Sequence, residues 1–89
     1  MLQEHYPNRL CYLRRRHGFS QKQMATLIGL RDRTMISKYE HGYVLPSFPV
    51  ASKFEIALDA GGPDIFPRHF QHWRQEVERV KESRLKVKA

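Results

Sequence analysis

Apolar residues recur at helical spacing in residues 19–29, FSQKQMATLIG. Met24, Ala25 and Ile28 fall on one face of a helix there, with polar residues around them. Ser20 has a side chain that can cap the start of such a helix, and the closing glycine can adopt the left-handed conformation common at helix ends. The segment therefore predicts a short amphipathic helix.

A second short helix is predicted a few residues further on, over residues 34–42, TMISKYEHG. Its inward positions are Met35, Ile36 and Tyr39, and Asp32 is placed to cap it. The first helix carries an alanine, which is small enough for the two helices to cross closely near the turn. Such a pair predicts a helix-turn-helix, which points to DNA, although spacing alone also fits two amphipathic helices of any all-helical domain.

Three more helices are predicted around this pair, because the chain shows no strand-like alternation. One runs over residues 7–17. Another is capped by Ser47, is stopped by the glycine pair at 61–62, and is expected to bury Phe48, Ala51, Phe54 and Leu58. A short turn of helix opened by Pro63 is expected to bury Ile65 and Phe66. The expected fold class is therefore all-α, with a five-helix domain over residues 1–66.

The pattern changes in residues 67–89. Four apolar residues recur there at spacings of three, four and three on a helix otherwise rich in charge: Phe70, Trp73, Val77 and Val80. This stripe covers about two heptads, which is short of the three or four that indicate a free coiled coil. It must pack either on its own domain or on the same helix of a second copy. Because five helices already close the core, we expect a dimerisation element, followed by a basic tail.

Composition agrees with a small binding module. The 89 residues suffice for one domain, and 16 Lys and Arg against 9 Asp and Glu give a formal net charge of +7, which suits a polyanionic partner. Ribosomal and membrane-surface proteins share such a balance, so charge alone decides little. No apolar run approaches the length of a membrane span and no apolar signal region opens the chain, so we expect a cytoplasmic protein. The single cysteine, Cys11, is expected to pack in the first helix.

A family resemblance is carried by residues 8–66. The matching positions, in order, are Leu10, Leu13, Arg14, Gly18-Phe19-Ser20-Gln21, Met24-Ala25, Gly29, Ile36-Ser37, Glu40, Gly42, Pro46-Ser47, Leu58 and Ile65-Phe66. In this pattern the chain resembles the lambda-repressor-like, Cro-type (Xre family) DNA-binding domain. Between Gly29 and Ile36 it has one residue more than the commonest family pattern, which affects where the recognition helix begins.

The resemblance implies roles for residues on and near the second helix of the pair. In this geometry that helix enters the major groove with its N-terminal half at the base edges. The implied base-contacting residues are Arg33, Thr34, Ser37 and Lys38. Arginine and lysine suit the O6 and N7 acceptors of guanine, and threonine can offer its methyl group to thymine. The alternative for each is a solvated polar side chain.

Phosphate contacts and one structural ion pair are also implied. Gln21, at the start of the first helix of the pair, matches the phosphate contact of the family, and exposed helix-end amides would assist it. His41 and Tyr43 are further candidates for phosphate contact. The family pattern also pairs Arg14 with Glu40, in an architectural role.

Other chemistry finds little support in the sequence. His69 and His72 lie three residues apart, but no matching set of ligands accompanies them, so no metal and no cofactor are expected. No nucleophile, paired-carboxylate or phosphate-loop motif is present, so we do not expect an enzyme. The main hypothesis is a repressor that binds double-stranded DNA at a palindromic operator as a homodimer. The alternatives are a DNA-binding antitoxin with a toxin partner, and an adaptor that binds proteins without reading bases.

Overall fold

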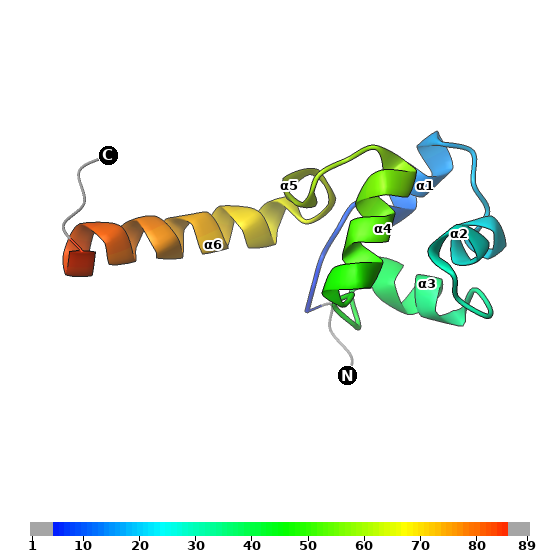
Figure 1. Cartoon of the computed structure of the whole chain (residues 1–89), viewed down its shortest axis with the longest axis horizontal. Coiled ribbons are helices and arrows are strands. Elements are labelled where there is room, and N and C mark those ends of the chain that lie inside the picture. Colours follow the sequence, from blue (N-terminus) through cyan, green and yellow to red (C-terminus); the bar gives the residue numbers. More distant parts are fainter. Residues whose placement is uncertain (1–4, 86–89) are drawn as a thin grey trace.

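The computed structural model describes residues 5–85, and this part of the chain is helical without any strand (Figure 1). The elements in chain order are α1 (Leu10–Arg16), α2 (Gln21–Ile28), α3 (Thr34–Glu40), α4 (Phe48–Leu58), α5 (Gly62–Ile65), α6 (Pro67–Val80) and a π-helical turn, η1 (Lys81–Leu85). The all-α prediction is thus confirmed. The basic tail predicted from the sequence lies partly outside the described residues. Within them, no helix is both long and apolar enough to span a membrane.

One hydrophobic core joins the first five helices. Its buried side chains are Leu10, Met24, Ala25, Ile28, Ile36, Tyr39, Phe54, Leu58, Ile65 and Phe66. The inward faces predicted for α2 and α3 are confirmed, except that Met35 is only partly buried against the core. The short turn at α5 buries Ile65 and Phe66, as predicted.

The ends of α2 follow the predicted chemistry. The Oγ of Ser20 accepts from the backbone N–H of Gln23 at 3.0 Å, and the Oε1 of Gln23 accepts from the backbone N–H of Ser20 at 2.8 Å. This reciprocal pair satisfies two of the amide groups that a helix start leaves free. Gly29 closes the helix at φ 86°, a conformation that few residues other than glycine adopt readily. Lys53 of α4 donates to the carbonyl oxygen of Ile28 at 3.3 Å and so places a cation at this helix end.

The start of α1 was predicted wrongly. The helix begins at Leu10 rather than at Pro7, because Asn8 organises the preceding residues. Its Oδ1 accepts from the backbone N–H of Leu10 at 2.9 Å, and its Nδ2 donates at 2.8 Å to the carbonyl oxygens of Tyr6 and Tyr39. Asn8 therefore holds the start of α1 against the end of α3.

Three predictions about α4 were also wrong. Phe48 is 85% exposed rather than buried, and Ala51 is half-buried. The helical period explains this, since Phe54 and Leu58 share one face whereas Phe48, six residues before Phe54, lies on another. The helix ends at Leu58 because Asp59 takes a left-handed conformation, at φ 49°, before the predicted glycine stop is reached.

α6 projects away from the domain (Figure 1). Only its first turns contact the core, through the partly buried ring of Phe70. Further along, Trp73, Val77 and Val80 are 37%, 52% and 45% exposed. The domain therefore leaves most of the predicted apolar stripe uncovered within a single chain.

Candidate nucleic-acid interface

The turn between α2 and α3 determines how α3 is presented. After Gly29, the backbone N–H of Leu30 donates to the carbonyl oxygen of Ala25 at 2.8 Å. The Oδ1 of Asp32 then accepts from the backbone N–H of Thr34 at 2.8 Å, and this hydrogen bond lowers the pKa of Asp32 below its ordinary value. The N-cap of α3 is Arg33, which makes no side-chain cap hydrogen bond, so the prediction that Asp32 caps the helix was wrong by one residue. Asp32 instead bonds the first helical residue from within the turn.

The four residues expected to contact bases lie together on the outer face of α3. Arg33, Thr34, Ser37 and Lys38 line one shallow surface hollow of about 340 Å³. Ser37 is half-buried and the other three are exposed, whereas Ile36 and Tyr39 on the inner face fill the core. The arrangement gathers two cationic side chains and two hydroxyl groups on the same side of one helix, and the hydroxyl of Ser37 lies 3.3 Å from the Nδ1 of His41.

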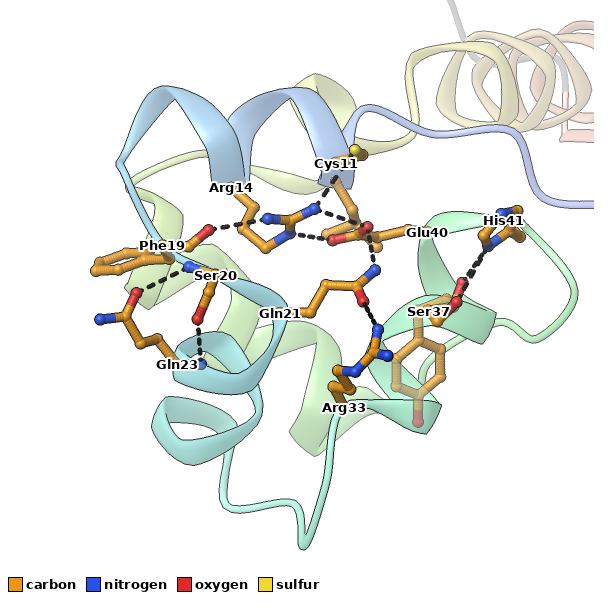
Figure 2. A network of polar contacts seen from close by, with 12 residues as sticks. Cys11, Arg14, Phe19, Ser20, Gln21, Gln23, Arg33, Ser37, Glu40 and His41 are labelled. Atoms are coloured by element: carbon orange, nitrogen blue, oxygen red, sulfur yellow. Dashed lines mark hydrogen bonds and ion pairs between the residues drawn. The ribbon is translucent and has the colours of Figure 1, made fainter.

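A buried ion pair anchors the end of α3 to α1. The Nε of Arg14 donates to the Oε2 of Glu40, and its Nη2 donates to the Oε1 at 3.2 Å (Figure 2). The Nη1 of Arg14 also donates to the carbonyl oxygen of Phe19 at 2.9 Å, just before α2. The side chains of Arg14 and Glu40 are only 9% and 6% exposed. The hydrogen bond to Glu40 raises the pKa of Arg14, so the guanidinium is charged at every pH near neutrality.

Gln21 extends this pair toward the outer face of α3. Its Nε2 donates to the Oε1 of Glu40 at 3.0 Å, and its Oε1 accepts from the Nη1 of Arg33 at 3.0 Å (Figure 2). From the sequence, Gln21 is expected at a phosphate. The pattern of residues gives no sign of this bridge, because the bridge depends on how α2 crosses α3. Its consequence is that an exposed arginine is connected, through one amide, to a buried carboxylate.

His41 and Tyr43 lie just beyond α3. Their rings stack at a centroid distance of 5.4 Å with 19° between the planes, and both side chains are exposed. The Nδ1 of His41 is 2.7 Å from the carbonyl oxygen of Ser37, which can only accept, so the proton lies on Nδ1. In this tautomer the Nε2 of His41 can accept a hydrogen bond but cannot donate one.

Metal ligands do not gather in the part of the chain described, residues 5–85, where no group of three His, Cys, Asp or Glu side chains could hold an ion. His69 instead packs its ring at 5.4 Å from that of Tyr6 and 5.3 Å from that of Trp73. His72 faces Glu76 at 3.0 Å, one helical turn along α6. The two histidines therefore have separate surroundings.

A model of a known protein family, described as "Helix-turn-helix", matches residues 12–65. This span runs from within α1 to the end of α5 and so includes the whole α2–turn–α3 unit. No curated protein matches the chain.

Proposed function

Because the chain belongs to the helix-turn-helix family of DNA-binding transcription regulators, we propose that it is a repressor that binds a palindromic operator as a homodimer. The observation that carries this proposal is the hollow on α3, which gathers Arg33, Thr34, Ser37 and Lys38 on one exposed face. The family is one of regulators and not of enzymes, and we place the activity in the cytoplasm. Contact with DNA and self-association suffice for repression, since a dimer that occupies an operator keeps other proteins from binding the same DNA.

In this proposal, the outer face of α3 and the residue just before it recognise bases. Arg33 and Lys38 would donate to the O6 and N7 of guanine, and Thr34 would contact thymine or accept a hydrogen bond. The bridge from Gln21 supports this assignment for Arg33, because a guanidinium held by an acceptor loses less side-chain entropy when it meets a base.

Phosphate contacts would surround the base-reading face. Gln21 lies at the start of α2, where free backbone N–H groups and the helix dipole favour an anion. Its Nε2 has a second hydrogen beyond the one that it donates to Glu40, and so it can reach a phosphate without breaking the bridge. Tyr43 would donate to a phosphate oxygen through its hydroxyl at the opposite end of α3. His41 would contact the backbone there once its proton moves from Nδ1 to Nε2, because a phosphate oxygen needs a donor.

A selection on random DNA duplexes tests the proposed function. The purified chain should enrich one sequence with two-fold symmetry, whose half-sites lie about one DNA turn, ~34 Å, apart. Enrichment of a single unrepeated site would contradict the homodimer, and no enrichment at all would favour the adaptor that does not read bases.

The exposed stripe on α6 also fits the second candidate function, a DNA-binding antitoxin. Trp73, Val77 and Val80 could hold a toxin rather than a second copy. A toxin-like gene beside this one, whose product co-purifies with the chain and is released by substitutions in the stripe, would support that reading.

A further inference from the structure

An apolar groove lies on the domain where α4, α5 and the start of α6 meet. Its volume is about 280 Å³, and the aromatic and aliphatic side chains along it include Leu45, Phe48, Phe54, Phe66, Phe70 and Trp73. Phe48 lies outside the core and lines this groove with 85% of its surface exposed. A soluble domain does not usually leave an apolar hollow and a large aromatic side chain together in water.

The groove continues into the exposed stripe of α6. Phe70 and Trp73 belong to both, and Val77 and Val80 follow Trp73 by four and seven residues, on the same helical face. The turn η1 has the i→i+5 pattern of a π-helix, which brings residues five apart to nearly the same side. Leu85, 66% exposed, thereby extends the stripe beyond Val80. Since α6 leads away from the domain, this outer half cannot fold back into its own groove (Figure 1).

We infer that the outer half of α6 from a second copy fills the groove, in an antiparallel and two-fold symmetric pair. The inference rests on the homodimer of the proposed function and specifies its geometry. A two-fold contact uses the same surface on both copies, so a surface with a hollow at one end and a protruding stripe at the other is self-complementary. Each groove then receives one stripe, and both apolar features are covered at once.

The order of side chains along α6 favours the antiparallel direction. With the symmetry axis level with Gln75, Phe70 lies opposite Val80 of the partner subunit, and Trp73 lies opposite Val77 of the partner subunit. Each layer thus sets a large ring against a small branched side chain. Leu85 of the partner subunit reaches the level of α5, where the groove lies. A parallel pair would set ring against ring and leave both grooves empty.

The charges of α6 and of the start of η1 favour the same direction. Residues 67–74 carry two arginines and no acidic residue, at Arg68 and Arg74. Residues 75–82 carry three acidic and two basic side chains, namely Glu76, Glu78, Glu82, Arg79 and Lys81. An antiparallel pair places the basic half of each helix beside the half that holds all the acids of the other, whereas a parallel pair places the two basic halves together.

Crosslinking of exposed positions tests the geometry in the full chain. Cys11 is first replaced by serine, and Val80→Cys and Phe48→Cys are then made in separate chains. In the antiparallel pair the two copies of position 80 lie ten residues apart along the helix axis, about 15 Å, and a short thiol crosslinker does not join them. We expect no covalent dimer from the Val80→Cys chain alone and a covalent dimer from its mixture with the Phe48→Cys chain.

Three results would overturn the inference. Efficient crosslinking of the Val80→Cys chain to itself would show a parallel pair and leave the homodimer standing. If light scattering shows a dimer but the mixture of Val80→Cys and Phe48→Cys chains gives no crosslinked product, the two copies associate through another surface. A chain that light scattering finds monomeric at tens of micromolar, without DNA, would remove the antiparallel pair and the preformed homodimer together, while the selection on random duplexes would still decide DNA binding.

Discussion

Glu40 is the residue on which the polar contacts between α1, α2 and α3 converge. Its carboxylate, 6% exposed, accepts from Arg14 through both oxygens and from Gln21 through one. A buried ion pair adds little net stability, because desolvation of the charges offsets their attraction. Loss of one partner is different, since the other charge then stays buried without compensation. The pair therefore acts as a constraint on how the three helices meet.

Glu40→Ala should lower the free energy of unfolding by about 3 kcal/mol, because it leaves the Arg14 guanidinium buried and unpaired. Denaturant unfolding measures the change. Glu40→Gln is the matched control, which keeps an acceptor for Gln21 and should cost less. An unchanged midpoint in the alanine variant would show that the pair does not constrain the domain in solution.

Arg33→Ala and Lys38→Ala should each weaken binding to the selected operator by about 1–3 kcal/mol and relax its sequence preference. The loss on a scrambled duplex should be smaller, since base contacts carry the preference. Arg31→Ala is the matched control: Arg31 is exposed in the turn but does not line the hollow on α3, and it carries the same charge. Equal losses on both duplexes for Arg33→Ala and Lys38→Ala would remove these residues from base recognition.

At the scale of the helices, the sequence predicted the inward faces of α2 and α3 and the ends of α2, but not the start of α1 or the end of α4. The ends of α2 followed from Ser20 and Gly29, because a cap and a left-handed exit involve only neighbouring residues. The hydrophobicity of Phe48 suggested a core position, although the helical period puts it on another face than Phe54 and Leu58. The bridge through Gln21 and the direction of α6 depend on contacts between elements. The order of residues along the chain does not predict such contacts.

Gly62 and the ring of Phe70 approach each other closely where α5 leads into α6. A Cβ at position 62 would lie 2.5 and 2.8 Å from two atoms of the Phe70 ring, closer than atoms can pack. Gly62→Ala should therefore displace the ring and destabilise the domain by about 1–3 kcal/mol, as overpacking does. Gly61→Ala is the control, because its nearest contact, 3.6 Å to Pro63, is ordinary. Unfolding curves that coincide for the two variants would contradict the prediction.

For the whole molecule, the domain holds the recognition surface and α6 holds the uncovered apolar surface. The described residues extend over 48 × 33 × 21 Å, and the long dimension reflects the projection of α6 (Figure 1). Association through α6 would give a dimer with two recognition helices, one for each half-site of an operator. Binding of the second half-site then becomes intramolecular, which can raise overall affinity by about 10²–10⁴ without any new contact to DNA.

The double substitution Val77→Ser and Val80→Ser should convert the chain to a monomer, because it removes two apolar side chains from the proposed interface. Both are about half exposed and outside the core, so the domain should remain folded. The variant should bind a single half-site as the unmodified chain does, yet lose most of the advantage of a palindrome over a half-site. Gln71→Ser with Gln75→Ser, on other faces of α6, is the control and should keep the dimer. Light scattering and titration of both duplexes measure the two effects, and a double variant that still prefers the palindrome as a dimer would show that α6 does not join the two copies.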